Sequence, residues 1–100
     1  MADGTSMASA EARIPTTKAS QYLQQLCKHW SHKYEVAFTP QEGRIPFANG
    51  AVCTLNATPD TLVLKVETAD PGALTRMEEV VINHLKRFAF REDLGEVRWS

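Results

Sequence analysis

The stretch "AVCTLNATPDTLVLKV", Ala51 to Val66, decides the fold, because hydrophobic residues alternate with other residues on both sides of a short turn. Alternation with a period of two predicts strands, and "TPD" at Thr58 to Asp60 predicts the turn between them. The residues predicted to face inward are Ala51, Cys53, Leu55 and Ala57, followed by Leu62, Leu64 and Val66. This stretch therefore predicts an antiparallel hairpin with one buried face.

The same period of two continues on the N-terminal side of this hairpin. Val36 and Phe38 are predicted to point inward from a strand that ends at the turn "PQEG", and Ile45 does so from the next strand, together with Phe47. "ANG" at residues 48–50 predicts a tight hairpin, because asparagine and glycine accept positive φ at low cost. Four consecutive strands joined by short turns predict an antiparallel meander, and "ARIPT" before them is a candidate edge strand.

After Thr17, hydrophobic residues recur with the period of an amphipathic helix. The stripe contains Ala19, Tyr22, Leu23, Leu26, Cys27 and Trp30. Thr16 or Thr17 is predicted to cap this helix, because a threonine oxygen accepts a hydrogen bond from a free N–H group of the first turn. One face of the helix is therefore predicted to pack on the sheet, and the opposite face is left to solvent.

A second amphipathic helix is predicted from Asp70 to about Phe88 or Phe90, because an N-cap aspartate is followed by proline at the first helical position. Its stripe contains Leu74, Met77, Val81, Leu85 and Phe88, and His84 falls inside that stripe. In "EVRWS", Val97 and Trp99 alternate with charged residues and predict a last strand.

This order of elements predicts an α+β fold. It is a two-layer sandwich in which an antiparallel, four- to five-stranded meander sheet carries two helices on one face. Residues 1–10 are small and polar and lack periodicity, so they are interpreted as a flexible tail or a cloning remnant. Residues 11–100 are interpreted as a single domain, a size that folds without disulfide or metal support.

Composition narrows the classes of function. Lys and Arg number 11 and Asp and Glu number 12, so no broad positive surface is predicted for nucleic acid or an anionic membrane. The sequence has no hydrophobic run long enough to span a bilayer, and its N-terminus lacks the features of a signal peptide. A cytoplasmic protein with two free thiols is therefore expected.

The segment "LCKHWSHK", Leu26 to Lys33, places one cysteine and two histidines close together in the sequence. At 100° per residue, Cys27 lies on one shoulder of the hydrophobic stripe, His29 lies on the other, and His32 lies further out. His29 and His32 are three residues apart and can share a metal ion, but a closed site needs about four ligands. Two solvated histidines are the favoured interpretation, an open and weak metal site is the alternative, and no cofactor is predicted.

Cys27 and Cys53 are both predicted to point into the core, where a free cysteine acts as a small hydrophobe. The alternative is a small thiol- or metal-dependent enzyme that uses Cys53 or Cys27 with His84. His84 itself is interpreted as a core histidine that hydrogen-bonds to the backbone. Arg87 and Arg91 suit the negative end of the second helix dipole, and an anion pocket built from this pair is the alternative.

The uncovered face of the predicted sheet offers one further possibility. Its residues are Ala37, Thr39, Val52, Thr54, Val63, Lys65 and Glu67. Val52 and Val63 give this face a modest hydrophobic centre, and Ile82 is expected to be exposed on the outer flank of the second helix. Scattered hydrophobic surface residues are common, so a monomer or weak homodimer is expected, and a structural homodimer through the open sheet face is an alternative.

Three segments, "YLQQLCKHWSHK", "GRIPFANGAVCTL" and "EEVVINHLKRFAFRE", resemble a small bacterial family known as domain of unknown function 2218. The resemblance extends from about Glu11 to Trp99, and Trp30 stands where phenylalanine is more often expected. It implies no established activity and no catalytic or binding residue. It does imply an association with siderophore-interacting flavoproteins, and hence with bacterial iron metabolism.

The leading hypothesis is a small, non-enzymatic binding or accessory module whose partner is a protein or a small ligand. Packing requires only the hydrophobic stripe of the first helix, whereas the opposite face carries both of its histidines and two lysines. The predicted binding residues are Gln25, Lys28, His29, His32 and Lys33.

Overall fold

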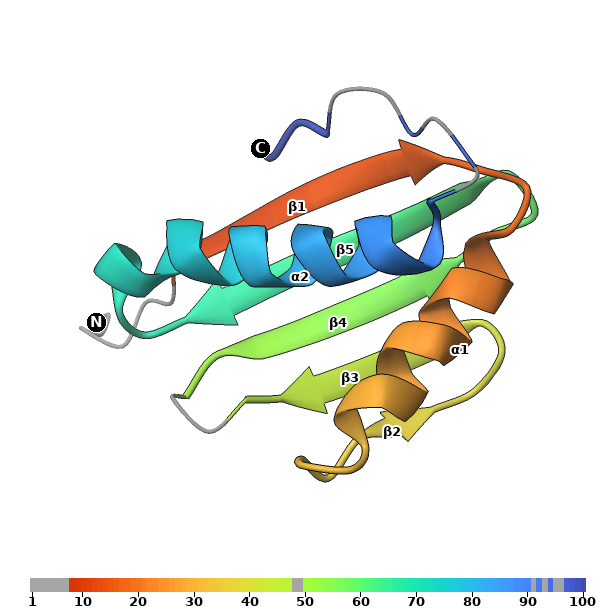
Figure 1. The fold of residues 1–100 in the computed structure, drawn as a ribbon. Coiled ribbons are helices and arrows are strands. Elements are labelled where there is room, and N and C mark those ends of the chain that lie inside the picture. The colour runs from red at the N-terminus through yellow and green to blue at the C-terminus, as the bar shows by residue number, and fades with distance from the viewer. Residues whose placement is uncertain (1–7, 48–49, 91, 93, 95–96) are drawn as a thin grey trace.

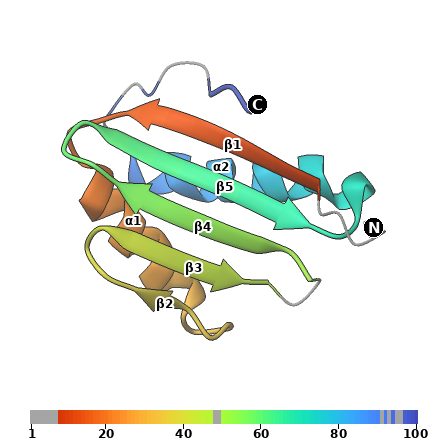
Figure 2. The ribbon, with the colours of Figure 1, turned by 180° about the vertical axis from the view of Figure 1, so that it is seen from behind.

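The computed structural model describes residues 8–47, 50–90, 92, 94 and 97–100. The elements follow in the order β1 (Ala8–Pro15), α1 (Ala19–Trp30), β2 (Ala37–Phe38), β3 (Glu42–Pro46), β4 (Val52–Ala57), β5 (Thr61–Thr68), a 3-10 turn η1 (Pro71–Ala73) and α2 (Leu74–Phe88). The five strands form one antiparallel sheet in the order β1-β5-β4-β3-β2. Both helices cover one face, and the view from behind shows the other face uncovered (Figures 1 and 2). The predicted α+β sandwich is confirmed.

The hairpin of β4 and β5 forms as the alternation predicts. Cys53 pairs with Val66, and Leu55 pairs with Leu64, so the inward-facing residues lie side by side beneath the helices. Apart from the half-buried Ala57, the predicted inward residues of both strands are buried. At the turn, the Thr58 N–H donates to the Thr61 carbonyl. The hydrophobic core therefore lies between this hairpin and the two helices.

Strand β1 begins at Ala8, inside the segment interpreted as a tail, and pairs with β5 along its whole length. Its inward residues are the buried Ala10, Ala12 and Ile14. The predicted last strand is reduced to one antiparallel bridge, between Trp99 and Ala12. The predicted edge strand was shorter than β1, because the small alanines of β1 give a weak hydrophobic alternation.

Strand β2 is shorter and more exposed than predicted. It contains only two residues, and Phe38, predicted to point inward, is 36% exposed. This strand lies at the sheet edge and pairs with β3 only through Ala37 and Phe38. The "ANG" hairpin lies largely outside the described residues, but Gly50 has the expected positive φ, 84°.

Helix α1 buries all six residues of its predicted stripe. Its N-cap is Lys18, which forms no side-chain cap, so the prediction of a cap at Thr16 or Thr17 is wrong. Instead, the Thr16 hydroxyl accepts a hydrogen bond from the Lys18 N–H in the turn that leads into the helix.

Helix α2 follows the predicted N-cap, because the Asp70 carboxylate accepts a hydrogen bond from the Gly72 N–H at 2.9 Å. This cap serves the 3-10 turn η1, and the α-helix starts at Leu74. The predicted exposure of Ile82 is wrong, since the residue is only 8% exposed. Ile82 shares a surface pocket with Val97 and Trp99, so the C-terminal segment shields this flank of the helix.

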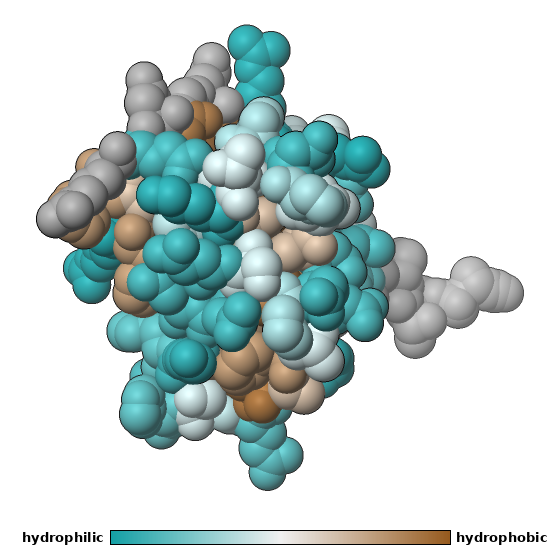
Figure 3. Space-filling model, turned by 90° about the vertical axis from the view of Figure 1, so that its right-hand side faces the viewer, coloured by the Kyte–Doolittle hydropathy of each residue, from teal (hydrophilic) through white to brown (hydrophobic). Residues whose placement is uncertain are grey.

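The two helices approach each other at one end and diverge toward the other (Figure 1). At the near end, the Tyr22 hydroxyl of α1 donates a hydrogen bond to the Glu92 carboxylate, which follows α2. Figure 3 shows the end of the molecule where β1 leads into α1. Hydrophilic side chains dominate that end, and hydrophobic surface is confined to separate patches.

Gly43 allows α1 to lie close to β3. A Cβ atom at this position would be 2.6 Å from Cys27 Sγ, closer than van der Waals contact permits. We expect Gly43→Ala to lower the free energy of unfolding by about 1–3 kcal/mol, the usual cost of overpacking a core. Urea denaturation followed by tryptophan fluorescence measures this loss.

Two further variants test the cause of this destabilisation. Cys27→Ala removes Sγ, so the double variant is expected to lose less stability than the sum of the two single variants. Additive losses would contradict the proposed contact. Gly72→Ala is the matched control, because its Cβ would meet nothing closer than Asp70 Oδ1 at 3.3 Å, and it should change stability little.

Candidate functional site

A cleft of about 530 Å³ opens between the diverging parts of the two helices. We call it the helix cleft, and its lining residues are His29, Trp30, Lys33, Tyr34, Phe47, Arg76, Met77, Val80 and His84. The end of α1 and the turn after it form one wall, and α2 forms the other. Phe47 comes from the end of β3 and is 8% exposed. A volume of this size suits a small organic molecule.

Aromatic packing fixes the shape of the helix cleft. The Trp30 and Phe47 rings meet edge to face with centroids 5.2 Å apart, and the Tyr34 ring meets Phe47 in the same way at 5.3 Å. The Tyr34 N–H donates to the Trp30 carbonyl at 2.9 Å, so the turn after α1 holds both aromatic residues in place. Edge-to-face pairs of this kind are favourable and restrict ring motion. The aromatic wall is therefore preformed.

Two histidines from different helices meet in this cleft. The centroids of the His29 and His84 rings are 5.0 Å apart, and His84 also packs against Trp30 at 4.6 Å. His84 Nδ1 lies 2.7 Å from the Val80 carbonyl oxygen. Because a carbonyl can only accept, Nδ1 carries a proton, and Nε2 is the His84 nitrogen left for other contacts. The expected backbone hydrogen bond of His84 is present, although the residue is only half buried.

The lining of the helix cleft is basic. Lys33 and Arg76 contribute one cation from each side, and none of the described lining residues is acidic. Within the described part of the chain, neither Lys33 nor Arg76 forms a salt bridge. Lys33 Nζ lies 5.8 Å from the centroid of the Tyr34 ring, a cation–π distance. The helix cleft therefore combines aromatic surface with unneutralised positive charge.

The surroundings of His29 lower the pKa of its imidazole. Its side chain is exposed overall, but its ring packs against Trp30 and Phe88 at 5.5 and 6.0 Å between centroids. Partial burial lowers the pKa of the His29 imidazole below its usual value, and nearby basic groups lower it further. In order of effect, these groups are His84, Arg87 and His32.

The predicted binding residues, which we call the α1 face, do not all lie together. Gln25, Lys28, His29 and His32 line a shallow depression of about 280 Å³ with Phe88, whereas Lys33 lines the helix cleft. His29 lines both. Gln25 Oε1 is buried and has no hydrogen-bond partner among the described residues.

Neither the described lining of the helix cleft nor that of the shallow depression contains a cluster of metal-binding side chains. No group of three or more histidine, cysteine, aspartate or glutamate residues within the described chain is arranged to hold a metal ion. The described ring contacts of His29 are with Trp30, His84 and Phe88, so the imidazole that packs against it is that of His84, and a weak metal site at His29 and His32 stays a prediction. No local pattern in the sequence indicates the contact between His29 and His84, because it depends on the angle between the helices.

Both cysteines lie in the core, as expected for free thiols. Burial raises the pKa of Cys27 to about 11. Burial and the neighbouring Cys27 raise the pKa of Cys53 to about 12. At neutral pH both therefore remain protonated, and a protonated thiol is a poor nucleophile.

The remaining predicted anion site is only partly described. Arg87 is exposed near the end of α2, close enough to lower the pKa of His29. Arg91 lies outside the described residues. The predicted pair therefore remains a prediction, while the structure identifies Lys33 and Arg76 as the cations that line a cleft.

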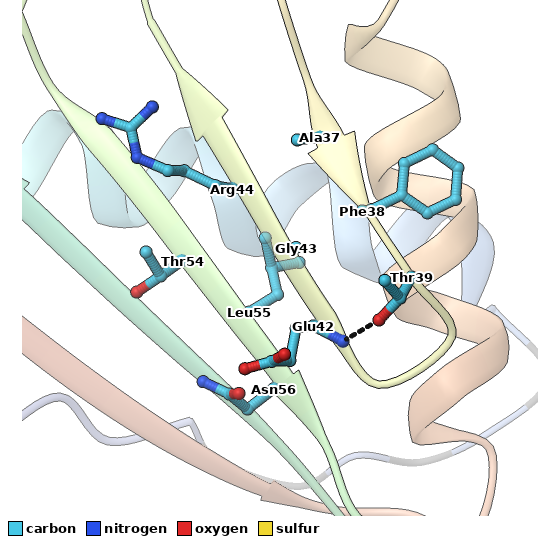
Figure 4. A pocket seen from close by; sticks show the side chains of 9 residues that line it. All are labelled: Ala37, Phe38, Thr39, Glu42, Gly43, Arg44, Thr54, Leu55 and Asn56. Carbon is cyan, nitrogen blue, oxygen red and sulfur yellow. Dashed lines mark hydrogen bonds between the residues drawn. The ribbon is translucent and has the colours of Figure 1, made fainter.

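A second depression, of about 580 Å³, lies over β2, β3 and β4. Figure 4 shows its side chains, with Arg44 beside Thr54 and Glu42 beside Asn56 on paired strands. Phe38 is its sole aromatic lining residue within the described chain. Despite its larger volume, this depression lacks the aromatic walls of the helix cleft and contains an acid and a base together.

The open sheet face carries charged residues around its hydrophobic centre. Lys65 lies opposite Thr54 on β4 and opposite Glu11 on β1, and Val63 lies between Asn56 and Arg13. Strand β1 thus adds charges that were not included in the predicted face. A homodimer through this face stays a prediction. None of the described helices combines the length and hydrophobicity needed to cross a bilayer.

Similarity to known proteins identifies the family. Residues 11–100 match the family described as "Uncharacterized protein conserved in bacteria (DUF2218)". The chain is also similar to PA4090 from Pseudomonas aeruginosa, whose structure was solved by NMR, with 38% sequence identity and a TM-score of 0.76. This match covers 92% of the present chain and 94% of PA4090. No curated protein matches the chain. The protein therefore belongs to the DUF2218 family of uncharacterised bacterial proteins.

Proposed function

We propose that this protein is a non-enzymatic binding module that holds a small organic anion with an aromatic or hydrophobic body in the helix cleft. One observation carries the proposal: the cleft places the aromatic residues Trp30, Tyr34 and Phe47 beside Lys33 and Arg76, with no acidic residue in its described lining. Ligand sites in proteins are typically concave and largely hydrophobic, with a few polar groups that orient the ligand.

The aromatic wall supports recognition of the ligand body. Trp30 and Phe47 are buried beneath the surface and held by edge-to-face contacts, so they lose little conformational entropy when a ligand packs on them. Met77 and Val80 add hydrophobic surface from α2. A flat ring or a branched hydrophobic group fits this lining better than a fully polar ligand does.

The two cations support recognition of a negative charge. The protein as a whole has a formal net charge of −1, so general attraction of anions is not expected. Lys33 and Arg76 instead create a local positive field in a concave region, where low-dielectric walls strengthen the attraction. Arg76 can also bind a carboxylate or sulfonate through two parallel hydrogen bonds.

The cleft offers little support for a catalytic reaction. Its described lining contains no serine, cysteine or carboxylate that could act as a nucleophile beside a histidine. The His84 Nδ1 proton is directed at a backbone carbonyl of the same helix rather than at an orienting carboxylate. Binding is therefore the function that this set of residues supports best.

The iron context implied by the family resemblance is compatible with this ligand class. An iron(III) catecholate complex is an aromatic anion, which is the chemistry that the helix cleft favours. In this form of the proposal, the protein is a cytoplasmic accessory module of iron or siderophore metabolism. The exposed histidines of the α1 face provide a neighbouring surface for a protein partner.

Three probes that share a p-tolyl ring test the proposal. We expect p-toluenesulfonate to shift the amide NMR signals of Trp30, Lys33, Tyr34 and Arg76 at pH 6, because it carries both a ring and a negative charge. 4-Methylbenzyl alcohol should bind more weakly, and 4-methylbenzylammonium most weakly. The iron(III) complex of 2,3-dihydroxybenzoate, examined separately by quenching of tryptophan fluorescence, tests the iron form of the proposal.

Charge variants identify the site. Lys33→Gln and Arg76→Gln should each weaken p-toluenesulfonate binding by about three- to tenfold, since one screened charge contact contributes about 0.5–1.5 kcal/mol. Lys65→Gln, on the opposite face of the sheet, is the matched control and should bind as the unchanged protein does. Equal binding of the three probes, or equal effects of all three variants, would contradict anion recognition in this cleft.

The alternative of a thiol enzyme makes an opposite prediction. Because both cysteines are buried with raised pKa values, we expect negligible reaction with a disulfide reagent at pH 7.5 in the folded protein. Both thiols should react rapidly in 8 M urea, which is the control for reagent and thiol content. Rapid reaction of one thiol without denaturant, abolished by Cys53→Ser or Cys27→Ser, would support the enzyme instead.

A further inference from the structure

His29 occupies a position that no other residue of the α1 face shares. It lines both the helix cleft and the shallow depression beside it, and its ring lies 5.0 Å from that of His84 between centroids. The site therefore places an ionisable imidazole where a bound anion would change its surroundings most. Neither the composition nor the spacing of the histidines in the sequence indicates this arrangement.

Among the described ionisable groups around His29, none is a carboxylate, and all except the Tyr34 phenol are basic. Helix α1 contributes Lys28, and the turn after it contributes His32 and Lys33; each lines one of the two depressions that His29 also lines. Helix α2 contributes Arg76 and His84 to the same lining, and Arg87 acts on His29 electrostatically. In the empty cleft, a proton on His29 adds a positive charge to a region that is already positive.

A bound anion would instead favour a proton on His29. It would neutralise part of the positive field of Lys33 and Arg76, and it would accept a hydrogen bond from a protonated imidazole. The hydrogen bond between His84 Nδ1 and the Val80 carbonyl fixes the orientation of the His84 ring. His29 is exposed, and within the described residues it makes no backbone hydrogen bond of the kind that holds His84.

We infer that binding of an organic anion in the helix cleft is coupled to the uptake of one proton by His29. This inference rests on the proposed function and adds its regulation: the module holds its ligand more tightly in mildly acidic conditions and releases it as the pH rises. The ligand class is then an anion that stays ionised throughout the physiological pH range.

The sign of the effect follows from linkage. The pKa of His29 is lowered in the free protein, so His29 is mostly neutral at pH 7, and a ligand anion raises that pKa. Affinity is therefore constant at pH values above the pKa in the complex, rises as the pH falls through that value, and levels off below the pKa in the free protein. By reciprocity, the anion strengthens proton binding by the same factor as the proton strengthens anion binding.

The test uses p-toluenesulfonate, which remains a monoanion throughout the range studied, so only the protein can take up the proton. Isothermal titration calorimetry between pH 5.0 and 8.5 should show affinity about tenfold higher at the acidic end, as a rise of about one unit in the pKa of His29 requires. The imidazole NMR signal of His29, followed with and without the sulfonate, should show that rise directly.

Two substitutions separate His29 from its neighbours. His29→Gln should bind the sulfonate with an affinity that is nearly independent of pH and close to the alkaline value of the unchanged protein. His32→Gln is the matched control, because it removes an exposed histidine just after the same helix, one that does not line the helix cleft, and it should keep the pH dependence.

Three other results would contradict the inference, the proposed function or both. Binding that is independent of pH in the unchanged protein overturns proton uptake and leaves the proposed function intact. A pH dependence that persists in His29→Gln, with no ligand-induced change in the His29 titration, assigns the proton elsewhere and overturns the inference. Failure of the sulfonate to bind at any pH overturns both the inference and the proposed function.

Discussion

The close approach of Cys27 to Gly43 determines where α1 lies on the sheet. The space above Gly43 is occupied by Cys27 Sγ, so the helix can lie lower over β3 than it could over a residue with a side chain. Trp30 follows Cys27 by one turn of the helix and contacts Phe47 at the end of the same strand. The core contact between Cys27 and Gly43 thus determines the position of Trp30, which forms part of the aromatic wall of the helix cleft.

The divergence of the helices gives the two ends of their interface different properties. Where they approach, the Tyr22 hydroxyl and the Glu92 carboxylate join α1 to the segment after α2. This bond stabilises the ionised form of the acid and lowers the pKa of Glu92, while burial and the same carboxylate raise the pKa of Tyr22 to about 12. Where the helices diverge, basic and aromatic groups without acidic partners remain. Glu92 is therefore used at the closed end, whereas the described lining of the helix cleft contains Lys33 and Arg76 and no acidic residue.

Periodicity in the sequence predicted most of the helices and strands, because the local sequence determines which face of each element is hydrophobic. The stripe of α1 is buried residue for residue, and β4 and β5 bury the alternating sets that their pattern indicated, apart from the half-buried Ala57. The errors arose where distant segments decide burial. Ile82 is covered by a C-terminal segment that bridges β1, and Phe38 lies on a two-residue strand at the sheet edge. The site was predicted less well for the same reason. The α1 face was identified from one helix alone, whereas the meeting of His29 and His84 depends on an interhelical angle that no local pattern contains.

The pairing of β1 with β5 has a consequence for the order in which the protein assembles. Strands β3, β4 and β5 follow one another with short turns, so their contacts form with little loss of loop entropy. Strand β1 must instead close a loop that contains α1 and the whole meander before its hydrogen bonds form. Helix α1 follows β1 directly and supplies one wall of the cleft, so the N-terminal third of the chain completes a surface that the meander cannot form alone. Any ligand of this cleft would bind only the fully docked state, and its concentration would then regulate how often β1 and α1 detach from an otherwise intact sheet.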